Sequence, residues 1–284
     1  MNLVRGLAPA AWLGVAGLLG FACQAEEERP PPQTCLGVQC FMHGNPGAKP
    51  GDGSGGSAGG SDGDGGEAPS VTLSGVVGHL LDDEFAYYEL YEGEVDLRAE
   101  SSDSGSERGV WRGSEPFTIR GVRQAPFTWL YGEPRVSSLG ALPTLKLIRT
   151  DEPNSDGVVF LEEGNAFILV RESIIEQIFG VLSSPITLDS RKGQVVLQLL
   201  TASGAGASGI QVTAPKADVV IYAVNGSFSE IPEETDSTGL VLLANVDGDS
   251  WPGELVEVGF QGDRSTAFDV RVITGAVTYA QIAP

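Results

Sequence analysis

Short runs of alternating apolar and polar residues recur from Ser70 to the C-terminus, separated by Gly, Asp, Ser and Pro. In "EVDLRA", residues 94–99, Val, Leu and Ala alternate with Asp and Arg, and residues 116–122 and 267–273 repeat the pattern. An alternation of period two is typical of a strand with one buried face. Many such strands separated by turn residues predict an all-β fold built of sandwich-like units of short antiparallel strands.

One segment, "RESIIEQIFGVL", has helical spacing instead. Its apolar positions are Ile174, Ile175, Ile178, Phe179 and Leu182. Ser173 followed by Glu176 forms a capping box, in which each side chain satisfies an otherwise unpaired backbone N–H. We therefore expect a short connecting helix near 173–182, with a buried strand as the alternative.

The stretch before Ser70 has a different composition. Residues 44–66 are mostly Gly, Ser, Asp, Ala and Pro, and such a segment buries too little apolar surface to offset its chain entropy. We expect a disordered, flexible Gly/Ser/Pro-rich tether over residues 23–69. Two β-sandwich-like units would follow, the first over 70–190, which includes the helix, and the second over 191–284.

The chain begins with an apolar run that ends at a cysteine. Leu7–Ala22 carries no charge, follows Arg5 and precedes Cys23 and an acidic, Pro-rich segment. The run is shorter than the roughly 20 residues of a membrane-spanning helix, and it has the form of a signal peptide. It resembles bacterial lipoprotein signals, in which the cysteine after the cleavage site is acylated.

That resemblance implies a signal peptide over residues 1–22 and a lipid anchor on Cys23. The expected location is the bacterial cell envelope, with the protein lipid-anchored at the outer membrane or cell surface. Plain secretion after cleavage at the same site and an uncleaved anchor are the alternatives.

The chain has three cysteines, Cys23, Cys35 and Cys40. If Cys23 carries the lipid, Cys35 and Cys40 are left to pair as a disulfide in an oxidising compartment, and reduced thiols are the alternative. With His43 they give three ligands, fewer than the four of a structural zinc site. We expect no metal and no cofactor.

The formal net charge is −21, from 38 acidic and 17 basic residues. A surface this acidic repels phosphate backbones, so nucleic acid is not an expected partner. The expected partners are a membrane, through the N-terminal lipid, and an envelope protein or glycan.

The C-terminal unit resembles a known family. Seven short strand-like runs cover residues 194–200, 210–214, 218–224, 239–245, 254–260, 267–273 and 276–282. Thr235–Gly239 reads "TDSTG", a turn in which an Asp side chain bonds the backbone two residues on and Gly accepts positive φ. Four further positions belong to the same pattern: Gly193, Gly209, Asn245 and Gly275.

These residues resemble the carboxypeptidase regulatory-like, or transthyretin-like, β-sandwich family. The resemblance implies an accessory module without catalytic residues of its own. Residues 70–150 share the strand texture and a "SGVV" opening, which suggests a diverged copy.

Three motifs have catalytic precedents and simpler explanations. Gly55–Gly59 matches G-x-S-x-G but lies in the tether. Gly204–Gly209 matches G-x-G-x-x-G, yet a strand follows it where a dinucleotide site needs a helix. His79 precedes Asp82 and Asp83 and is expected to be a surface histidine. No spacing singles out a carboxylate pair for hydrolysis.

Two further groups have alternative interpretations. Asp247 and Asp249 could bind calcium, or could simply serve the turn "NVDGDS". Phe127, Trp129 and Tyr131 alternate and so share one strand face. Buried, they are core; exposed, they form a ligand platform to which Tyr87 contributes.

The sequence predicts a non-enzymatic binding, adhesion or spacer module of the cell envelope. The alternative is a carbohydrate-binding module that serves a separate enzyme, and a hydrolase is a third class. Exposure of the row Phe127, Trp129 and Tyr131 would favour the carbohydrate-binding module.

Overall fold

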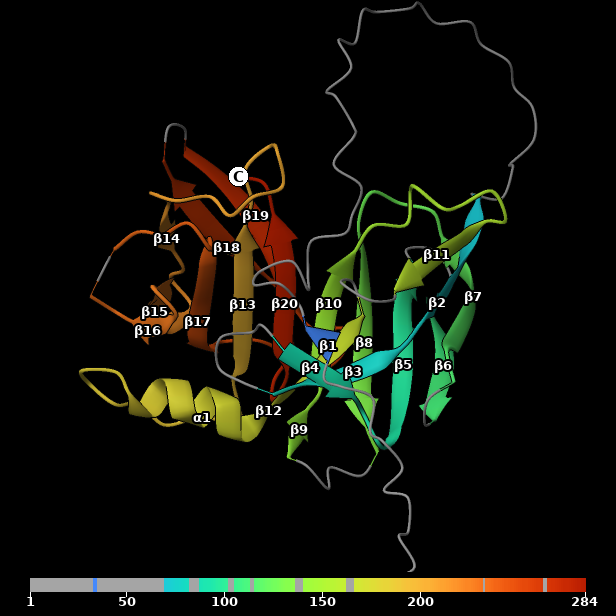
Figure 1. Cartoon of the computed structure of the whole chain (residues 1–284), viewed down its shortest axis with the longest axis horizontal. Helices are drawn as coiled ribbons and strands as arrows, with labels where there is room; N and C mark the ends of the chain where they lie inside the picture. Colours follow the sequence, from blue (N-terminus) through green and yellow to red (C-terminus); the bar gives the residue numbers. More distant parts are fainter. Residues whose placement is uncertain are drawn as a thin grey trace, which may run out of the picture. The chain divides into compact units, whose positions relative to one another are not determined.

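The computed structural model describes residues 33–34, 69–81, 87–101, 105–112, 115–135, 140–161, 166–231, 233–262 and 265–284. Within these ranges one helix accompanies many short strands, which confirms the expected all-β fold (Figure 1). In this described part of the chain, no helix has the length and apolar character needed to cross a membrane. Cys23, Cys35 and Cys40 lie outside the described residues, as does almost all of the predicted tether.

The strands occur in two series along the chain. The first comprises β1 (Gln33–Thr34), β2 (Ser70–Gly75), β3 (Val77–Leu80), β4 (Tyr87–Leu90), β5 (Glu94–Ser101), β6 (Gly105–Arg112), β7 (Phe117–Arg123), β8 (Thr128–Pro134), β9 (Ala141–Leu142), β10 (Thr144–Ile148), β11 (Val158–Leu161) and β12 (Phe167–Arg171). After helix α1 (Glu172–Gly180) come β13 (Gly193–Leu199), β14 (Gln211–Thr213), β15 (Ala217–Val224), β16 (Ser227–Ser229), β17 (Leu240–Val246), β18 (Glu254–Gln261), β19 (Ser265–Val272) and β20 (Val277–Ile282).

A nine-stranded sheet contains strands from both series. Its order is β16-β15-β17-β13-β20-β10-β8-β5-β6. The two series meet where β10 pairs in parallel with β20, with Thr144 opposite Val277 and Lys146 opposite Tyr279. The boundary expected near residue 190 therefore separates strands that share one sheet, and the described strands from Ser70 onward belong to one compact unit.

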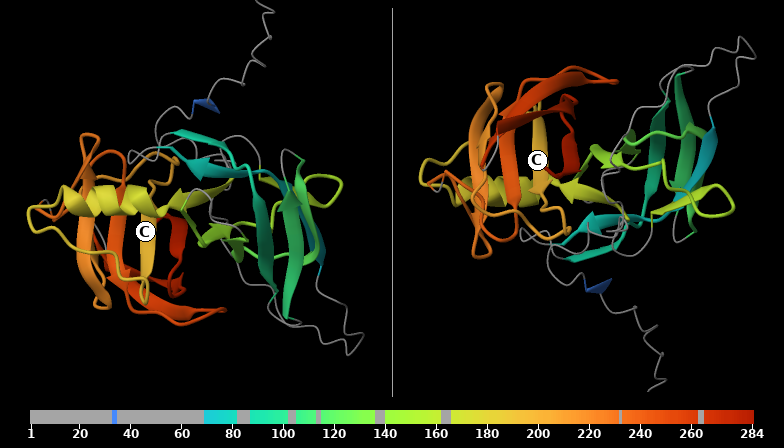
Figure 2. Two further views of the ribbon diagram at one scale, coloured as in Figure 1. Left: turned by 90° about the horizontal axis from the view of Figure 1, so that it is seen from below. Right: turned by 90° about the horizontal axis from the view of Figure 1, so that it is seen from above.

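One face of this sheet packs on the smaller sheet β14-β18-β19 (Figure 2). Alternate residues of the central strands point to this side. Every residue of β13 and β17 is buried, so both faces of these strands are covered. We call the resulting cluster the sandwich core; its members include Val195, Leu197, Val241, Leu243, Val258, Phe260, Val270 and Val272. Burial on both faces explains why these strands are continuous apolar runs in the sequence.

Helix α1 covers the opposite face of the same strands (Figure 2). Its apolar stripe, predicted from the spacing, packs against β13, β15, β17 and β20 in what we call the helix-side core. The members include Ile174, Ile175, Ile178, Phe179, Val196, Ile221, Leu242 and Tyr279. The expected helix is confirmed, and the buried-strand alternative is wrong.

The predicted capping box is also wrong. The helix begins at Glu172, and its N-cap is Arg171, which makes no side-chain capping hydrogen bond. Ser173 and Glu176 are therefore both inside the helix. Glu172 still places an acidic side chain in the first turn, where the helix dipole favours negative charge.

The remaining strands build two further sheets, β1-β4-β3-β12-β9 and β11-β2-β7. With β5, β6 and β8 they enclose the N-terminal core, whose members include Leu73, Val77, Val95, Leu97, Ala99, Trp111, Phe117, Ile119, Leu130 and Phe167. The alternation predicted for residues 94–99 and 116–122 is confirmed, because Val95, Leu97, Ala99, Phe117 and Ile119 are all buried here.

The "TDSTG" turn has the predicted geometry. The Thr238 N–H donates to Asp236 Oδ1 at 2.8 Å, and Gly239 has φ +65°. Asp236 Oδ2 also accepts the Asn225 N–H at 3.0 Å, so one carboxylate holds two turns. Burial acts to raise the pKa of Asp236, but the hydrogen bonds from Thr238 and Asn225 outweigh it and lower the pKa.

Candidate functional site

The aromatic row of β8 divides between core and surface. Trp129 and Tyr131 are 7% and 6% exposed and belong to the sandwich core. Phe127, just before β8, is 54% exposed. The row is therefore not an open platform of three rings. The fourth expected member, Tyr87, has its backbone in β4, but its side chain lies outside the described residues.

The row meets two rings from the second series of strands. Tyr131 lies 5.1 Å from Trp251, centroid to centroid, with the ring planes tilted by 35°. Phe127 meets Phe268 edge to face at 6.1 Å. We call these four rings and Trp129 the aromatic seam. Sequence reasoning missed Trp251 and Phe268 as partners of the row, because more than a hundred residues separate them from β8.

Charged groups border the buried part of the seam. The Arg98 guanidinium lies 5.7 Å from the centre of the Tyr131 ring and forms an ion pair with Glu133 at 3.3 Å. Burial, with the nearby Glu133, raises the pKa of Tyr131 to about 12. The phenol is thus neutral across the physiological range, and Phe127 is the ring that the seam presents to solvent.

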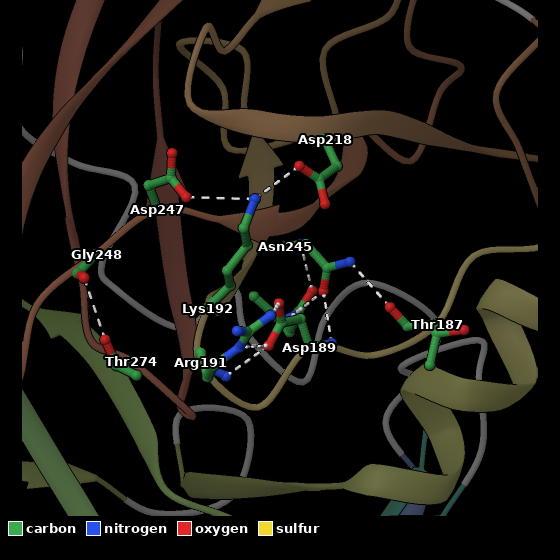
Figure 3. Close-up of polar contacts among 10 residues, drawn as sticks. Thr187, Asp189, Arg191, Lys192, Asp218, Asn245, Asp247, Gly248 and Thr274 are labelled. Atoms are coloured by element: carbon green, nitrogen blue, oxygen red, sulfur yellow. Dashed lines mark hydrogen bonds and ion pairs between the residues drawn. The ribbon is translucent and has the colours of Figure 1, made fainter.

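A second polar cluster surrounds Lys192, which lies in the loop before β13 and has partners at the start of β15 and in the loop after β17 (Figure 3). Lys192 Nζ lies 2.8 Å from Asp218 Oδ1 and 3.3 Å from Asp247 Oδ1. Hydrogen bonds to Asp218 and Asp247 raise the pKa of Lys192. Nearby, the Arg191 guanidinium holds the pKa of Asp189 at about 2.

Asn245 ties these loops to the sheet (Figure 3). It has φ +50°, and its side-chain carbonyl accepts the Asp189 N–H at 3.1 Å and Gln194 Nε2 at 3.1 Å. Its own Nδ2 donates to the Thr187 carbonyl at 3.0 Å. The expected landmark at Asn245 thus closes the connection from α1 into β13.

The calcium interpretation of "NVDGDS" finds no ligand set in the described residues. Asp247 is paired with Lys192, and the backbone carbonyl of Asp249 accepts the Thr274 N–H at 2.9 Å. Within those residues, no three His, Cys, Asp or Glu side chains converge in a way that could hold a metal ion.

His79 is not the surface histidine that the sequence suggested. It is 2% exposed, and its Nε2 lies 3.0 Å from Glu89 Oε1 and against Arg171 Nη2. Burial, followed by the charge of Arg171, lowers the pKa of His79. A neutral ring either accepts a hydrogen bond from Arg171 or donates one to Glu89, so its role here is to connect β3, β4 and β12.

A shallow polar hollow of about 560 Å³ lies at one end of the pair β14–β18. Its lining residues are Gly209, Gln211, Glu233, Glu234, Gln261 and Gly262. Gln211 and Gln261 are directly opposite each other across the two strands. As expected, the Gly-rich segment at 204–209 is a loop between strands, β13 and β14.

No protein-family model and no curated protein matches this chain. Among solved structures, a Streptococcal ancillary pilin aligns with 76% of this chain and 68% of its own, at 9% sequence identity and a TM-score of 0.21. A TM-score this low supports no conclusion about fold or function. The resemblances to lipoprotein signals and to transthyretin-like sandwiches therefore stay predictions.

Proposed function

We propose that the chain is a cell-envelope lipoprotein whose β-rich body serves as a non-enzymatic binding, adhesion or spacer module. In this proposal the N-terminal lipid on Cys23 holds the protein on the membrane. The Gly/Ser-rich segment gives it reach, and the body after Ser70 carries the working surface.

The observation that carries the non-enzymatic proposal is that three ionisable side chains, His79, Asp236 and Lys146, are engaged in structural contacts. His79 is buried between Arg171 and Glu89, and Asp236 holds two turns. Lys146 is 3% exposed and donates to the Ala166 carbonyl at 2.9 Å. Each of these groups has a structural task, whereas catalysis needs an acid, base or nucleophile that can reach a substrate.

The shared sheet supports a spacer or adhesion role. Parallel pairing of β20 with both β10 and β13 makes the two series of strands one hydrogen-bonded body. A body joined in this way is suited to hold a ligand at a fixed distance from an anchor.

Two experiments test this proposal. Cys23→Ser should move the protein from the membrane to the soluble fraction, whereas Cys35→Ser should not. The soluble Cys23→Ser chain is then incubated with isolated envelope material and a panel of envelope glycans. We expect retention with no change in the mass of the ligand; turnover abolished by a single carboxylate substitution would establish a hydrolase instead.

A carbohydrate-binding module is the second candidate, and the exposure of Phe127 favours it. A ring that is 54% exposed, with its edge-to-face partner Phe268 holding it in place, offers a face for stacking. If this ring binds glycan, Phe127→Ala should lower glycan retention at least tenfold. The matched control is Phe160→Ala on β11, which removes a ring of similar exposure, 51%. Equal effects of the two changes would contradict a Phe127 site.

A further inference from the structure

The first strands after the tether are held on both edges. β2 (Ser70–Gly75) and β3 (Val77–Leu80) are separated only by Val76, so they form one almost continuous extended segment. β2 lies between β7 and β11, and β3 lies between β4 and β12. The segment is therefore central in two sheets.

Hydrogen bonds continue across the junction between the two strands. The Val76 N–H donates to the Leu161 carbonyl at 3.1 Å, and the Val76 carbonyl accepts the Phe167 N–H at 3.1 Å. On β2, the Thr72 N–H donates to the Gly157 carbonyl at 2.9 Å. On the side of β11 and β12, the backbone hydrogen bonds therefore continue from β2 into β3 across Val76.

Side chains of the segment enter two cores. Leu73 and Val77 are 0% exposed in the N-terminal core, and Leu80 is 1% exposed in the helix-side core. Gly75 packs so closely on β11 that a Cβ there would lie 2.4 Å from the Leu161 carbonyl oxygen. To withdraw this segment, two backbone ladders must break and buried apolar side chains must enter water.

A neighbouring strand in the same sheet lacks this protection. β11 (Val158–Leu161) is an edge strand, paired in parallel with β2 over four residues. Phe160 on β11 is 51% exposed. An edge strand separates from its sheet by loss of a single ladder, one bond after another.

We infer that β2–β3 is a mechanical anchor, which holds the body against tension on the N-terminal segment once the two-residue edge pairing of β1 with β4 has separated. The inference rests on the proposed tethered function, because only an attached protein carries such tension. A pull at residue 69 acts first on Ser70, at the start of the segment that is clamped on both edges. An attachment to an edge strand would instead let the body open at low force.

Single-molecule force spectroscopy of the full chain tests the anchor without changing β2. The three native cysteines are replaced by Ser, and one handle is attached through Glu67→Cys, just before β2. The comparison protein carries the handle at Asp156→Cys, in the exposed turn before β11. Both share a second handle after Pro284, which acts on β20, a strand paired on both edges.

We expect the first rupture through residue 67 to need a higher force than the first rupture through residue 156, because two ladders rather than one must break. Equal forces, or a lower force through residue 67, would overturn the anchor. Coincident thermal melts of the two proteins establish that both are folded. A chain that shows the force difference but fails to bind envelope material would lose the proposed function and keep the anchor.

Discussion

At the scale of single residues, Lys146 is the most unusual side chain of the described structure. It lies on β10 in the middle of the nine-stranded sheet and is 3% exposed. Burial lowers the pKa of its amine to about 7. A group that holds its proton weakly when folded makes stability depend on pH.

We predict that Lys146→Met removes a rise in stability between pH 7 and pH 10. The unfolded chain keeps the Lys146 proton up to about pH 10.5 and the folded chain only up to about pH 7. The unfolded state thus binds more protons across this window, so stability rises with pH there, and below pH 7 the full cost remains, on the order of 3–5 kcal/mol. Urea melts of the variant and the wild type across this window measure the effect.

At pH 7 the same substitution should stabilise the protein by about 2 kcal/mol, because it removes the cost of burying the amine. The gain is smaller than that cost, since the Ala166 carbonyl loses its hydrogen-bond donor. Lys216→Met is the control, since Lys216 is 42% exposed beside Glu254 and should leave the rise in place. If the stability of the variant changed with pH as that of the wild type does, the folded protein would keep the Lys146 proton above pH 7, and the lowered pKa would be wrong.

A second residue-scale prediction concerns Asp236. Asp236→Ala removes the acceptor of the Thr238 and Asn225 N–H groups and should cost about 1–2 kcal/mol at pH 7. The folded pKa of Asp236 is lowered, so this contribution is present above its unfolded pKa of 3.8 and is lost as the pH falls through the folded value. Denaturant melts of variant and wild type should therefore differ at pH 7 and converge at low pH. Ser237→Ala, at the exposed neighbouring position, should leave the stability unchanged at both pH values.

At the scale of elements, the turn before β17 depends on Gly239. Its φ is +65°, and a Cβ there would lie 2.1 Å from the Leu199 carbonyl oxygen and 2.9 Å from the Ala207 nitrogen. Gly204, in the loop after β13, also has a positive φ, of +82°, but nothing lies within 4 Å of its Cβ position. An added Cβ would therefore meet backbone strain at both glycines, but steric overlap only at Gly239.

We predict that Gly239→Ala destabilises the protein by about 3–5 kcal/mol, which combines a left-handed backbone with an overlap that the sheet cannot relieve. Gly204→Ala should cost about 1 kcal/mol, from backbone strain alone. Denaturant melts of the two variants give the comparison. Similar costs at both positions would show that the Leu199 strand moves aside and that the turn is looser than its hydrogen bonds suggest.

Local patterns predicted the elements well and their ends less well. The period-two runs at residues 94–99 and 116–122 are β5 and β7, because alternation follows directly from one buried face. The start of α1 could not be read in the same way. Ser173 has the right chemistry for a cap, but Ile174 and Ile175 must both face the helix-side core, and the chain enters the helix directly from β12 at Arg171.

At the scale of the whole molecule, the sequence did not predict which strands would pair. The aromatic row was visible at Phe127, Trp129 and Tyr131, yet its burial depends on Trp251 and Phe268, whose approach is set by tertiary packing. In the same way, the expected helix and the family resemblance of the C-terminal unit suggested a boundary near residue 190. The parallel register of β10 with β20 depends on contacts 130 residues apart, which no local period encodes.

The shared sheet predicts that the described body unfolds as one unit. Trp111 lies in the N-terminal core, and Trp251 packs against the sandwich core, so each reports on one series of strands. In two variants that each keep one of these tryptophans, with the others replaced by Phe, the urea midpoint by fluorescence should equal the midpoint by far-UV circular dichroism. The reason is that β10 and β20 cannot part without exposing Leu145 and Val277, both 0% exposed.

Comparison within each variant removes the effect of the Phe substitutions themselves on stability. A body made of two independent units would behave differently: the Trp111 and Trp251 signals would change at separate urea concentrations, and circular dichroism would follow both. That outcome would support the expected boundary near residue 190 and would mean that the β10–β20 ladder is too weak to couple the two series. Coincident midpoints would instead show that the β10–β20 ladder couples the unfolding of the two series. Such coupling is what the proposed spacer or adhesion role needs.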